Sequence, residues 1–200
     1  MKHIFKKLTE KDKKLSKILE SDTNCIFHKK EKFTANQHYL SLCREIIGQQ
    51  LSVKAAKSIW NKFVKGIKSN KKLIEKIQSI KIEDHKLHGL SRNKLTFLKE
   101  LSENFINKKI NFNKFDQMEN EEIINHLITI KGIGRWTAEM FLIFSMKRLD
   151  VFSVDDLGLR KAVIKLYKLK NDDREKILKI SLKWKPYRSI VSWYLWRALD

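Results

Sequence analysis

Apolar residues recur every three or four positions along almost the whole chain, which is the spacing that places side chains on one face of an α-helix. One such stripe follows Ser91, a residue type favoured before the first turn of a helix, and consists of Leu95, Leu98, Leu101 and Phe105. The same spacing predicts further helices over residues 9–20, 70–79, 135–146, 156–168, 173–182 and 187–198. No run alternates apolar and polar residues between turn-forming residues, so we expect no β-sheet. The pattern predicts an all-α fold.

Capping residues mark the starts of three more helices. They are Thr34, which can form a capping box with Gln37 before a segment running to Ile47; Ser52, before a segment that ends at Gly66; and Asn120, before Glu121–Ile128. The chain shows no internal repeat and no low-complexity linker. Any division into domains must therefore be made by helices packing around a cleft.

Charge is the strongest feature of the composition. The 200 residues carry a formal net charge of +20, which favours a polyanionic partner, nucleic acid before an anionic membrane surface. Abundant Lys, Asn and Ile with few Arg are also typical of a chain encoded by AT-rich DNA, so charge alone does not decide the partner. The longest aliphatic and aromatic stretch, Met140–Phe144, is too short to cross a bilayer. Two cysteines, Cys25 and Cys43, exclude a disulfide framework and indicate a reducing compartment.

Residues 128–137 join the end of one predicted helix to the start of the next. Gly132 and Gly134 are separated only by Ile133, and because glycine has no Cβ, each can take a positive φ in a very tight reversal. The missing side chains also let another backbone approach closely. Amides at the start of the second helix point outward beside the positive end of its dipole, which suits a phosphate. Such a turn would grip DNA by its backbone without reading its sequence.

The longer sequence Gly-Ile-Gly-Arg-Trp-Thr-Ala, residues 132–138, resembles the hairpin of the helix-hairpin-helix (HhH-GPD) DNA glycosylase superfamily, in particular its 3-methyladenine, or alkylpurine, branch. That family places a catalytic aspartate some twenty residues after the hairpin, a spacing that matches Asp156, with Asp155 beside it. An acid at a helix start is held by backbone amides and by the helix dipole. An isolated Asp-Asp pair is more often a simple cap, but the hairpin and the spacing together favour catalysis.

Two other segments extend the resemblance, which spans residues 40–198 in four blocks. Glu45–Ala56 resembles the family's segment at the start of a helix that faces the minor groove, and Gln50 would stand where the family inserts a wedge into the gap left by the everted base. Trp184–Ser189, followed by Trp193 and Trp196, resembles the closing helix of the alkylpurine branch. Residues 1–40 are too few for the N-terminal β domain that some relatives carry, so we expect the short form.

The resemblance implies three groups of site residues besides Asp156. The implied DNA contacts are Gln49, Gln50, Ser52, Gly132, Gly134, Arg135 and Thr137. The implied aromatic pocket is formed by Trp136, Trp196, Met140 and Trp193, of which Met140 stands where relatives have an aromatic residue and Trp193 could also belong to the core. The hairpin carbonyls of Ile128, Ile130 and Ile133 would bind a monovalent cation, Na⁺ or K⁺. For Trp60 and Trp184 we expect core packing.

Two features favour an enzyme that does not nick the strand. Relatives that do so carry a hairpin lysine, which forms a Schiff base with the sugar, where this chain has Trp136. Lys131 lies five residues earlier, in the turn. Many such relatives also hold an iron–sulfur cluster through four C-terminal cysteines, which this chain lacks. We therefore expect no iron–sulfur cluster, no cofactor beyond the hairpin cation, and base excision by water.

Alkylated purines suit this set of residues. A base such as 3-methyladenine or 7-methylguanine is cationic, and its bond to the sugar is already weak, so little acid catalysis is needed. An aromatic slot attracts such a cation through ring faces, and a carboxylate stabilises the oxocarbenium-like sugar. Asp156 would do the latter and orient or deprotonate water.

The expected protein is a monomer of two helical lobes with the active-site cleft between them, residues 1–40 with 146–200 and residues 41–145. Its partner would be damaged double-stranded DNA, with no membrane. It would lie in the cytoplasm, near the nucleoid, in a prokaryote and in the nucleus in a eukaryote. Two alternatives stay open: a related glycosylase for deaminated or mismatched bases, and a non-catalytic helix-hairpin-helix module that only holds DNA.

Overall fold

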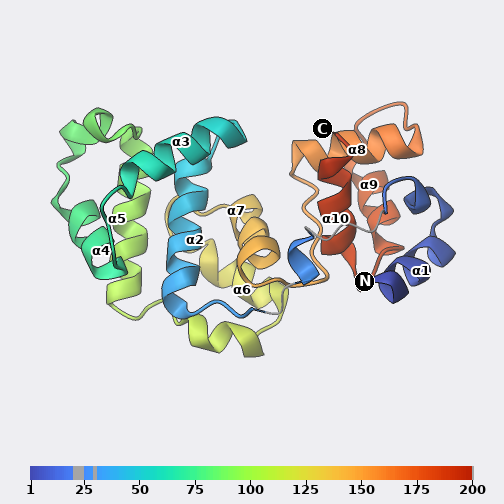
Figure 1. Ribbon diagram of the computed structural model, residues 1–200, viewed down its shortest axis with the longest axis horizontal. Helices are drawn as coiled ribbons and strands as arrows, with labels where there is room; N and C mark the ends of the chain where they lie inside the picture. The colour runs from blue at the N-terminus through green and yellow to red at the C-terminus, as the bar shows by residue number, and fades with distance from the viewer. Residues whose placement is uncertain (20–24, 29–30, 200) are drawn as a thin grey trace. The chain divides into compact units, whose positions relative to one another are not determined.

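The computed structural model describes residues 1–19, 25–28 and 31–199, and this part of the chain contains helices and no strand (Figure 1). The elements, of which those marked η are 3₁₀ helices except the π-helix η5, are α1 (Lys2–Lys11), η1 (Lys13–Lys17), η2 (Ile26–His28), α2 (Ala35–Gly48), α3 (Val53–Phe63), α4 (Asn70–Ser79), η3 (Ile82–His88), α5 (Arg92–Ile106), η4 (Phe112–Gln117), α6 (Asn120–Leu127), α7 (Arg135–Met140), η5 (Phe141–Ser145), α8 (Leu157–Tyr167), α9 (Arg174–Leu182) and α10 (Arg188–Arg197). The all-α prediction is confirmed. No helix in these ranges is long and apolar enough to span a membrane.

The chain folds into two compact units. The terminal unit comprises Met1–Glu31 and Leu142–Asp200, and the central unit comprises Lys32–Phe141. The boundaries expected from the sequence, after residues 40 and 145, lie further along the chain than those of the structure. The capping box at Thr34 already belongs to the central unit, and most of η5 belongs to the terminal unit.

The central unit is built around α2, which packs against α3, α5 and α7 (Figure 1). Tyr39 on α2 is fully buried and stacks on Phe105 of α5, with ring centroids 4.6 Å apart. Its hydroxyl shares a hydrogen bond of 2.8 Å with Ser102. These contacts fix α2 against α5. Because α2 is held in this way, the core also sets the position of the turn that follows its last residue, Gly48.

The terminal unit has its own core around Trp184, whose side chain is fully buried. Packed with it are Leu15, Phe152, Leu159, Val163, Ile177, Val191 and Leu195. The core position predicted for Trp184 is confirmed, whereas Trp60 in the central unit is only half-buried. Helices α8 and α10, which flank this core, carry the residues described below.

Three of the four predicted capping residues, Thr34, Ser52 and Ser91, stand directly before their helices. Thr34 forms the predicted capping box with Gln37, and Ser52 and Ser91 each accept a hydrogen bond from the third amide of their helix. The prediction for Asn120 is wrong by one residue, because Glu119 takes the cap position and its amide donates to the Glu122 carboxylate at 2.6 Å.

The predicted helix 9–20 is wrong. Helix α1 ends at Lys11, and η1 follows as a separate element; residue 20 itself lies outside the described residues. The cause is Asp12, whose carboxylate accepts a hydrogen bond from the Lys14 amide at 3.1 Å and so starts a new turn. A short acidic side chain competes in this way with the helical backbone. The predicted helix 135–146 is α7 continued by the π-helix η5.

Candidate active site

Asp156 lies in the terminal unit at the cap position of α8. Its Oδ1 accepts two hydrogen bonds, from the Leu159 amide at 2.8 Å and from the Trp196 Nε1–H at 2.9 Å. The first is the capping bond of α8, and the second comes from α10, 40 residues further along the chain. Two N–H donors on one oxygen hold a carboxylate in one orientation. The side chain is half-buried, so it is fixed without being sealed from solvent.

Two residues that the sequence did not single out support this carboxylate. Phe144 of η5 stacks on the Trp196 ring, with centroids 5.5 Å apart at an interplanar angle of 28°. Gly158 leaves room for the contact, because a Cβ there would lie 3.1 Å from Asp156 Oδ1 and 3.2 Å from Trp196 Cδ1. A glycine two residues after an expected catalytic acid is a signal that could have drawn attention to this close approach.

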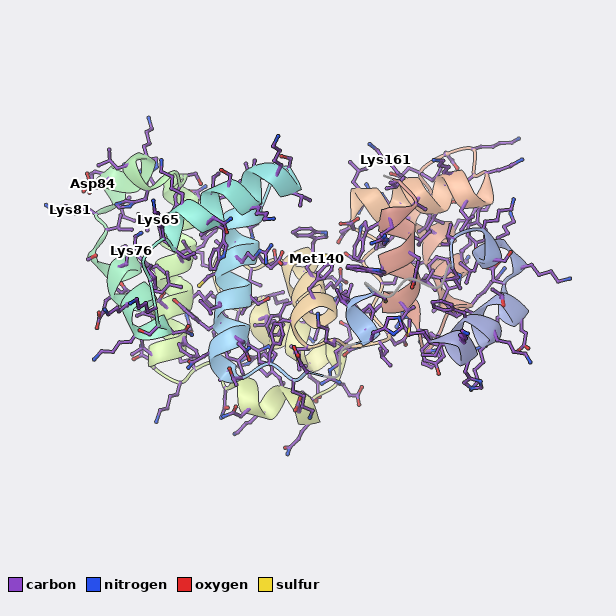
Figure 2. The ribbon with its side chains drawn as sticks, viewed as in Figure 1. Lys65, Lys76, Lys81, Asp84, Met140 and Lys161 are labelled. Atoms are coloured by element: carbon purple, nitrogen blue, oxygen red, sulfur yellow. The ribbon has the colours of Figure 1, made fainter. Side chains whose placement is uncertain are left out.

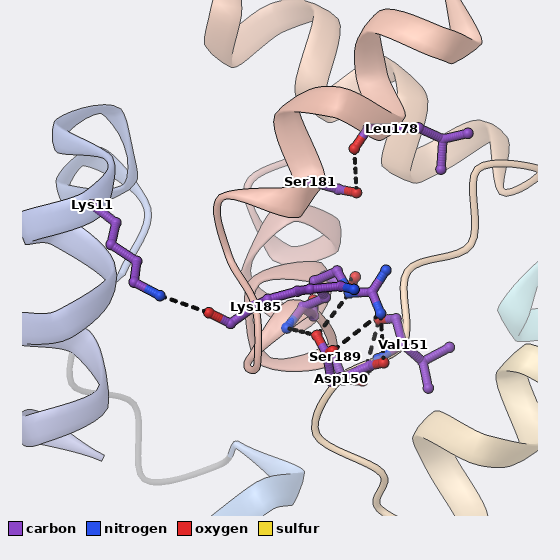
Figure 3. A network of polar contacts seen from close by, with 9 residues as sticks. Lys11, Asp150, Val151, Leu178, Ser181, Lys185 and Ser189 are labelled. Atoms are coloured by element: carbon purple, nitrogen blue, oxygen red, sulfur yellow. Dashed lines mark hydrogen bonds and ion pairs between the residues drawn. The ribbon is translucent and has the colours of Figure 1, made fainter. Parts of the chain in front are cut away.

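The segment that leads to Asp156 is anchored to α10 (Figure 3). Arg188 binds both carboxylate oxygens of Asp150, at 2.7 Å and 3.1 Å, in the bidentate geometry that favours arginine. The next residue, Ser189, accepts a hydrogen bond from the Val151 amide at 2.9 Å. The start of α10 thus fixes the start of this segment.

The end of the same segment is held by arginines of α8 and α9. Arg160, which is only 8% exposed, donates to the Val154 carbonyl at 3.0 Å and to the Asp172 carboxylate at 2.9 Å. Asp155 forms an ion pair with Arg174 at 2.9 Å, and both side chains are well exposed. Asp155 therefore forms an ion pair at the protein surface, whereas its neighbour Asp156 accepts hydrogen bonds from Leu159 and Trp196.

The two glycines of the hairpin differ. Gly132 has a φ of +92°, in the left-handed region, and a Cβ there would lie 2.0 Å from Cγ of Phe97 on α5. Gly134 is the cap of α7 with a φ of −89°, which any residue can adopt, and a Cβ there would meet nothing within 4 Å. Only Gly132 thus uses the positive φ that glycine allows. Gly132 makes room for α5, and Gly134 leaves its outer side open.

The first helical hydrogen bond of α7 runs from the Ala138 amide to the Gly134 carbonyl at 3.0 Å. Phosphate binding at the hairpin would use amides ahead of that bond, at the start of the helix. Thr137, whose amide was expected to contact a phosphate, is a buried residue, only 3% exposed.

Arg135 is held by two carboxylates in the same unit. Its Nη2 contacts Glu121 at 2.5 Å and its Nε contacts Glu139 at 3.1 Å. Hydrogen bonding to Glu121 is the largest of the contributions that raise the pKa of this guanidinium. A phosphate contact by the Arg135 side chain would have to compete with these partners. The pair with Glu121 also fastens α7 to α6, whereas the pair with Glu139 lies within α7.

Gln49 connects the end of α2 to the hairpin. Its Nε2 donates to the Gly132 carbonyl at 2.9 Å and to the Thr137 hydroxyl at 3.2 Å. The side-chain amide of Gln49 is thus engaged with protein atoms rather than directed at DNA. Lys94 supports the same turn, because its Nζ donates to the Ile47 carbonyl at 2.8 Å, and partial burial lowers its pKa.

The turn after Gln49 projects into solvent. Gln50 is exposed and has a φ of +58°, a conformation that costs free energy for a residue with a side chain. Ser52 caps α3, accepting from the Ala55 amide at 3.3 Å. Leu51 and Val53 on either side are 38% and 86% exposed, and the sequence analysis missed both. A strained turn with exposed apolar side chains suits insertion between stacked bases.

The expected pocket residues come from both units. Half-buried Trp136 and buried Met140 belong to α7 of the central unit (Figure 2). Trp193 and Trp196 belong to α10 of the terminal unit, where Trp193 meets Phe144 edge-on at 6.4 Å. Two of the four thus lie in each unit.

The expected cation ligands surround the hairpin turn. The Ile130 carbonyl accepts a hydrogen bond from the Ile133 amide at 3.0 Å. A carbonyl oxygen has two lone pairs, so this bond is compatible with a cation on the second one. The cation site at Ile128, Ile130 and Ile133 stays a prediction.

Replacing Gln49 by alanine is expected to lower the free energy of unfolding by about 1–3 kcal/mol, because the buried Thr137 hydroxyl and the Gly132 carbonyl lose their shared donor. For a chain of this size that corresponds to a drop of about 2–12 °C in melting temperature. Gln50→Ala is the matched control, since Gln50 is exposed and has no hydrogen bond in the described part of the chain. Equal melting temperatures for the two variants would contradict the role of Gln49 as the link to the hairpin.

Comparisons with known proteins identify the family of this chain. A family model described as HhH-GPD superfamily base excision DNA repair protein matches residues 43–186. The DNA-3-methyladenine glycosylase 1 of Schizosaccharomyces pombe is 39% identical to this chain over 80% of its length and 72% of that protein's. The DNA-3-methyladenine glycosylase of Saccharomyces cerevisiae is 31% identical, over 95% of this chain and 77% of that protein.

A solved structure of the Schizosaccharomyces pombe 3-methyladenine DNA glycosylase in complex with abasic DNA matches with a TM-score of 0.81 and 32% identity, covering 98% of this chain and 95% of that one. The family match covers well over half of the chain and includes both the hairpin and Asp156. The chain therefore belongs to the HhH-GPD superfamily of base excision DNA repair proteins, in its 3-methyladenine DNA glycosylase branch.

Proposed function

We propose that this protein is a monofunctional DNA glycosylase that removes alkylated purines, such as 3-methyladenine and 7-methylguanine, from duplex DNA and leaves an abasic site. The observation that carries the proposal is the carboxylate of Asp156, held at the start of α8 by the Leu159 amide and the Trp196 indole. The similar proteins named as 3-methyladenine glycosylases and the similar structure solved with abasic DNA support it.

The chemistry follows from the charge of the substrate. In an alkylated purine nucleotide the base is cationic, so it leaves with the electron pair of the C1′–N bond as a neutral molecule. Positive charge then builds up on C1′ and the ring oxygen of the sugar. An oriented carboxylate stabilises that charge most where it develops, in the transition state. A water oxygen then bonds to C1′, and its proton passes to Asp156 or to solvent, which completes hydrolysis.

Hydrolysis without strand cleavage is consistent with the hairpin. A Schiff-base mechanism requires an amine beside the sugar, and the hairpin position that would supply one is occupied by Trp136 on α7. Lys131 is exposed in the turn before Gly132. We therefore expect abasic DNA as the product, with nicks appearing only after alkaline treatment.

The test incubates the purified protein with methylated duplex DNA and identifies the released bases. We expect free 3-methyladenine and 7-methylguanine, and much slower release of hypoxanthine or uracil from matched duplexes. Faster release of hypoxanthine or uracil would instead support the related glycosylase for deaminated or mismatched bases. Tight binding to abasic DNA with no release from any substrate would support the non-catalytic module.

Trp196→Phe is expected to slow base release by about 10- to 100-fold, which corresponds to the loss of one hydrogen bond to a charged group. Phenylalanine can still stack on Phe144, so the melting temperature should change little. The measurement is the rate of methylpurine release under single-turnover conditions.

Trp193→Phe is the matched control for this change. Its indole Nε1 is buried and has no hydrogen-bond partner in the described part of the chain, so this substitution removes no hydrogen bond. It should therefore slow release less than Trp196→Phe does. Equal effects of the two substitutions would show that ring size, rather than the bond to Asp156, is what matters.

A further inference from the structure

A long stretch of the central unit carries basic residues and no acidic ones. Between residues 46 and 74 the chain has seven lysines and neither aspartate nor glutamate. At the frequency in the whole chain, 23 acidic residues in 200, about three would be expected in a stretch of this length. The stretch begins beside the exposed turn at Gln50 and ends in α4.

The seven lysines are all exposed. Lys54, Lys57 and Lys62 lie on α3, Lys65 follows it, Lys68 precedes α4, and Lys71 and Lys72 lie in the first turn of α4. We call this set the α3–α4 lysine face; Figure 2 labels Lys65 on it. The lysines within α3 fall in an arc of about 140°, opposite the buried Phe63, which faces the core. The face is thus directed away from α2.

Within the residues that the structure describes, the charges of this face are not neutralised by acidic partners. No lysine of the face forms an ion pair in the described part of the chain, whereas Lys32, Arg135 and Arg188 each do. The first turns of α3 and α4 contain no acidic residue. Lysines there oppose the positive end of the helix dipole, which destabilises the helices. These lysines destabilise the isolated protein, and an anionic partner bound to the face would offset that cost. The arrangement therefore favours an anionic partner.

The dimensions fit duplex DNA. Helix α3 has 11 residues and is therefore about 16 Å long, the length of about five base pairs of a duplex. It begins at the turn that carries Gln50, which the family resemblance places at the gap left by the everted base. A helix that starts there and carries lysines along its outer side can follow the phosphates away from the lesion.

We propose that the α3–α4 lysine face binds the phosphate backbone of undamaged duplex DNA on one side of the damaged nucleotide. The proposal rests on the proposed function for the position of the lesion. Its contacts are with phosphates and carry no sequence information. The face therefore adds affinity for any duplex. It also prolongs the time that the protein stays bound to undamaged DNA before it meets a lesion.

The test compares two triple variants that each remove three positive charges. Lys62→Gln/Lys65→Gln/Lys68→Gln changes the face at positions away from the Gln50 turn. Lys176→Gln/Lys179→Gln/Lys183→Gln changes exposed lysines on or next to α9 of the terminal unit. Binding to undamaged duplexes of about 10 and 30 base pairs is measured by fluorescence anisotropy over a range of salt concentrations, because each phosphate contact contributes about −0.9 to the slope of log affinity against log salt.

For the face variant we expect the slope on the long duplex to become shallower by about 2–3, with a smaller change on the short duplex. The α9 variant should keep a slope within about one unit of wild type. Equal changes in both variants would show a general effect of net charge and overturn the proposal, and so would an unchanged slope in the face variant. Melting temperatures confirm that both variants are folded.

The outcome is separable from that of the proposed function. Methylpurine release by the wild-type protein tests the glycosylase, whereas the salt slope on undamaged DNA tests the lysine face. Release together with an unchanged slope in the face variant removes only the lysine face. A shallower slope in a protein that releases no base keeps the face and removes the glycosylase.

Discussion

Asp156→Asn is expected to reduce the rate of methylpurine release by about 100- to 1,000-fold while duplex binding is retained. Asparagine keeps an oxygen that can accept from the Leu159 amide and the Trp196 indole, so the local geometry should persist. What it removes is the negative charge that stabilises the oxocarbenium-like sugar. Losing that charge also removes repulsion toward phosphate, so affinity for DNA should be unchanged or higher.

The substitution separates chemistry from folding because asparagine caps helices about as well as aspartate. The melting temperature should therefore stay close to that of the wild-type protein. The measurements are single-turnover base release and anisotropy with duplex DNA. The control is Asp155→Asn, which removes an exposed ion pair with Arg174 and should change release by only a few-fold.

Release by Asp156→Asn within about threefold of wild type would show that this carboxylate does not act on the sugar. The assignment of the active site would then be wrong, although the family membership would stand.

The helices could largely be predicted from the sequence because their signals are local. Periodic apolar residues and caps such as Thr34, Ser52 and Ser91 act within one or two turns, and the structure confirms these caps. The failures have local causes as well. Asp12 starts a new turn inside the predicted helix 9–20, since its side chain competes with the helical backbone.

The parts of the candidate site could be predicted, but their mutual support could not. Asp156 and the hairpin glycines were found from short motifs. The bond from Trp196 to Asp156 spans 40 residues, and the bond from Gln49 to Gly132 spans 83. No periodicity or local motif reports a contact over such a separation, because it depends on how the helices pack. The same holds for Phe97, whose ring lies against Gly132.

Gly132→Ala is expected to destabilise the protein strongly, by about 3 kcal/mol or more. Two costs combine: alanine would be strained at a φ of +92°, and its Cβ would overlap the Phe97 ring at 2.0 Å. For a chain of 200 residues this corresponds to a fall in melting temperature of about 6–12 °C or more. The measurement is thermal unfolding followed by circular dichroism.

Gly134→Ala, two residues away, is the control, and the opposite result is expected. Its φ of −89° suits alanine, and the added Cβ would meet no atom within 4 Å, so the fold should be stable. The methyl group would instead occupy the open side of the hairpin, where a phosphate is expected to approach, and DNA affinity should fall about tenfold. If Gly134→Ala binds DNA like the wild-type protein, the strand does not approach the hairpin from this side. If Gly132→Ala melts like the wild-type protein, the packing of α5 does not require the first glycine.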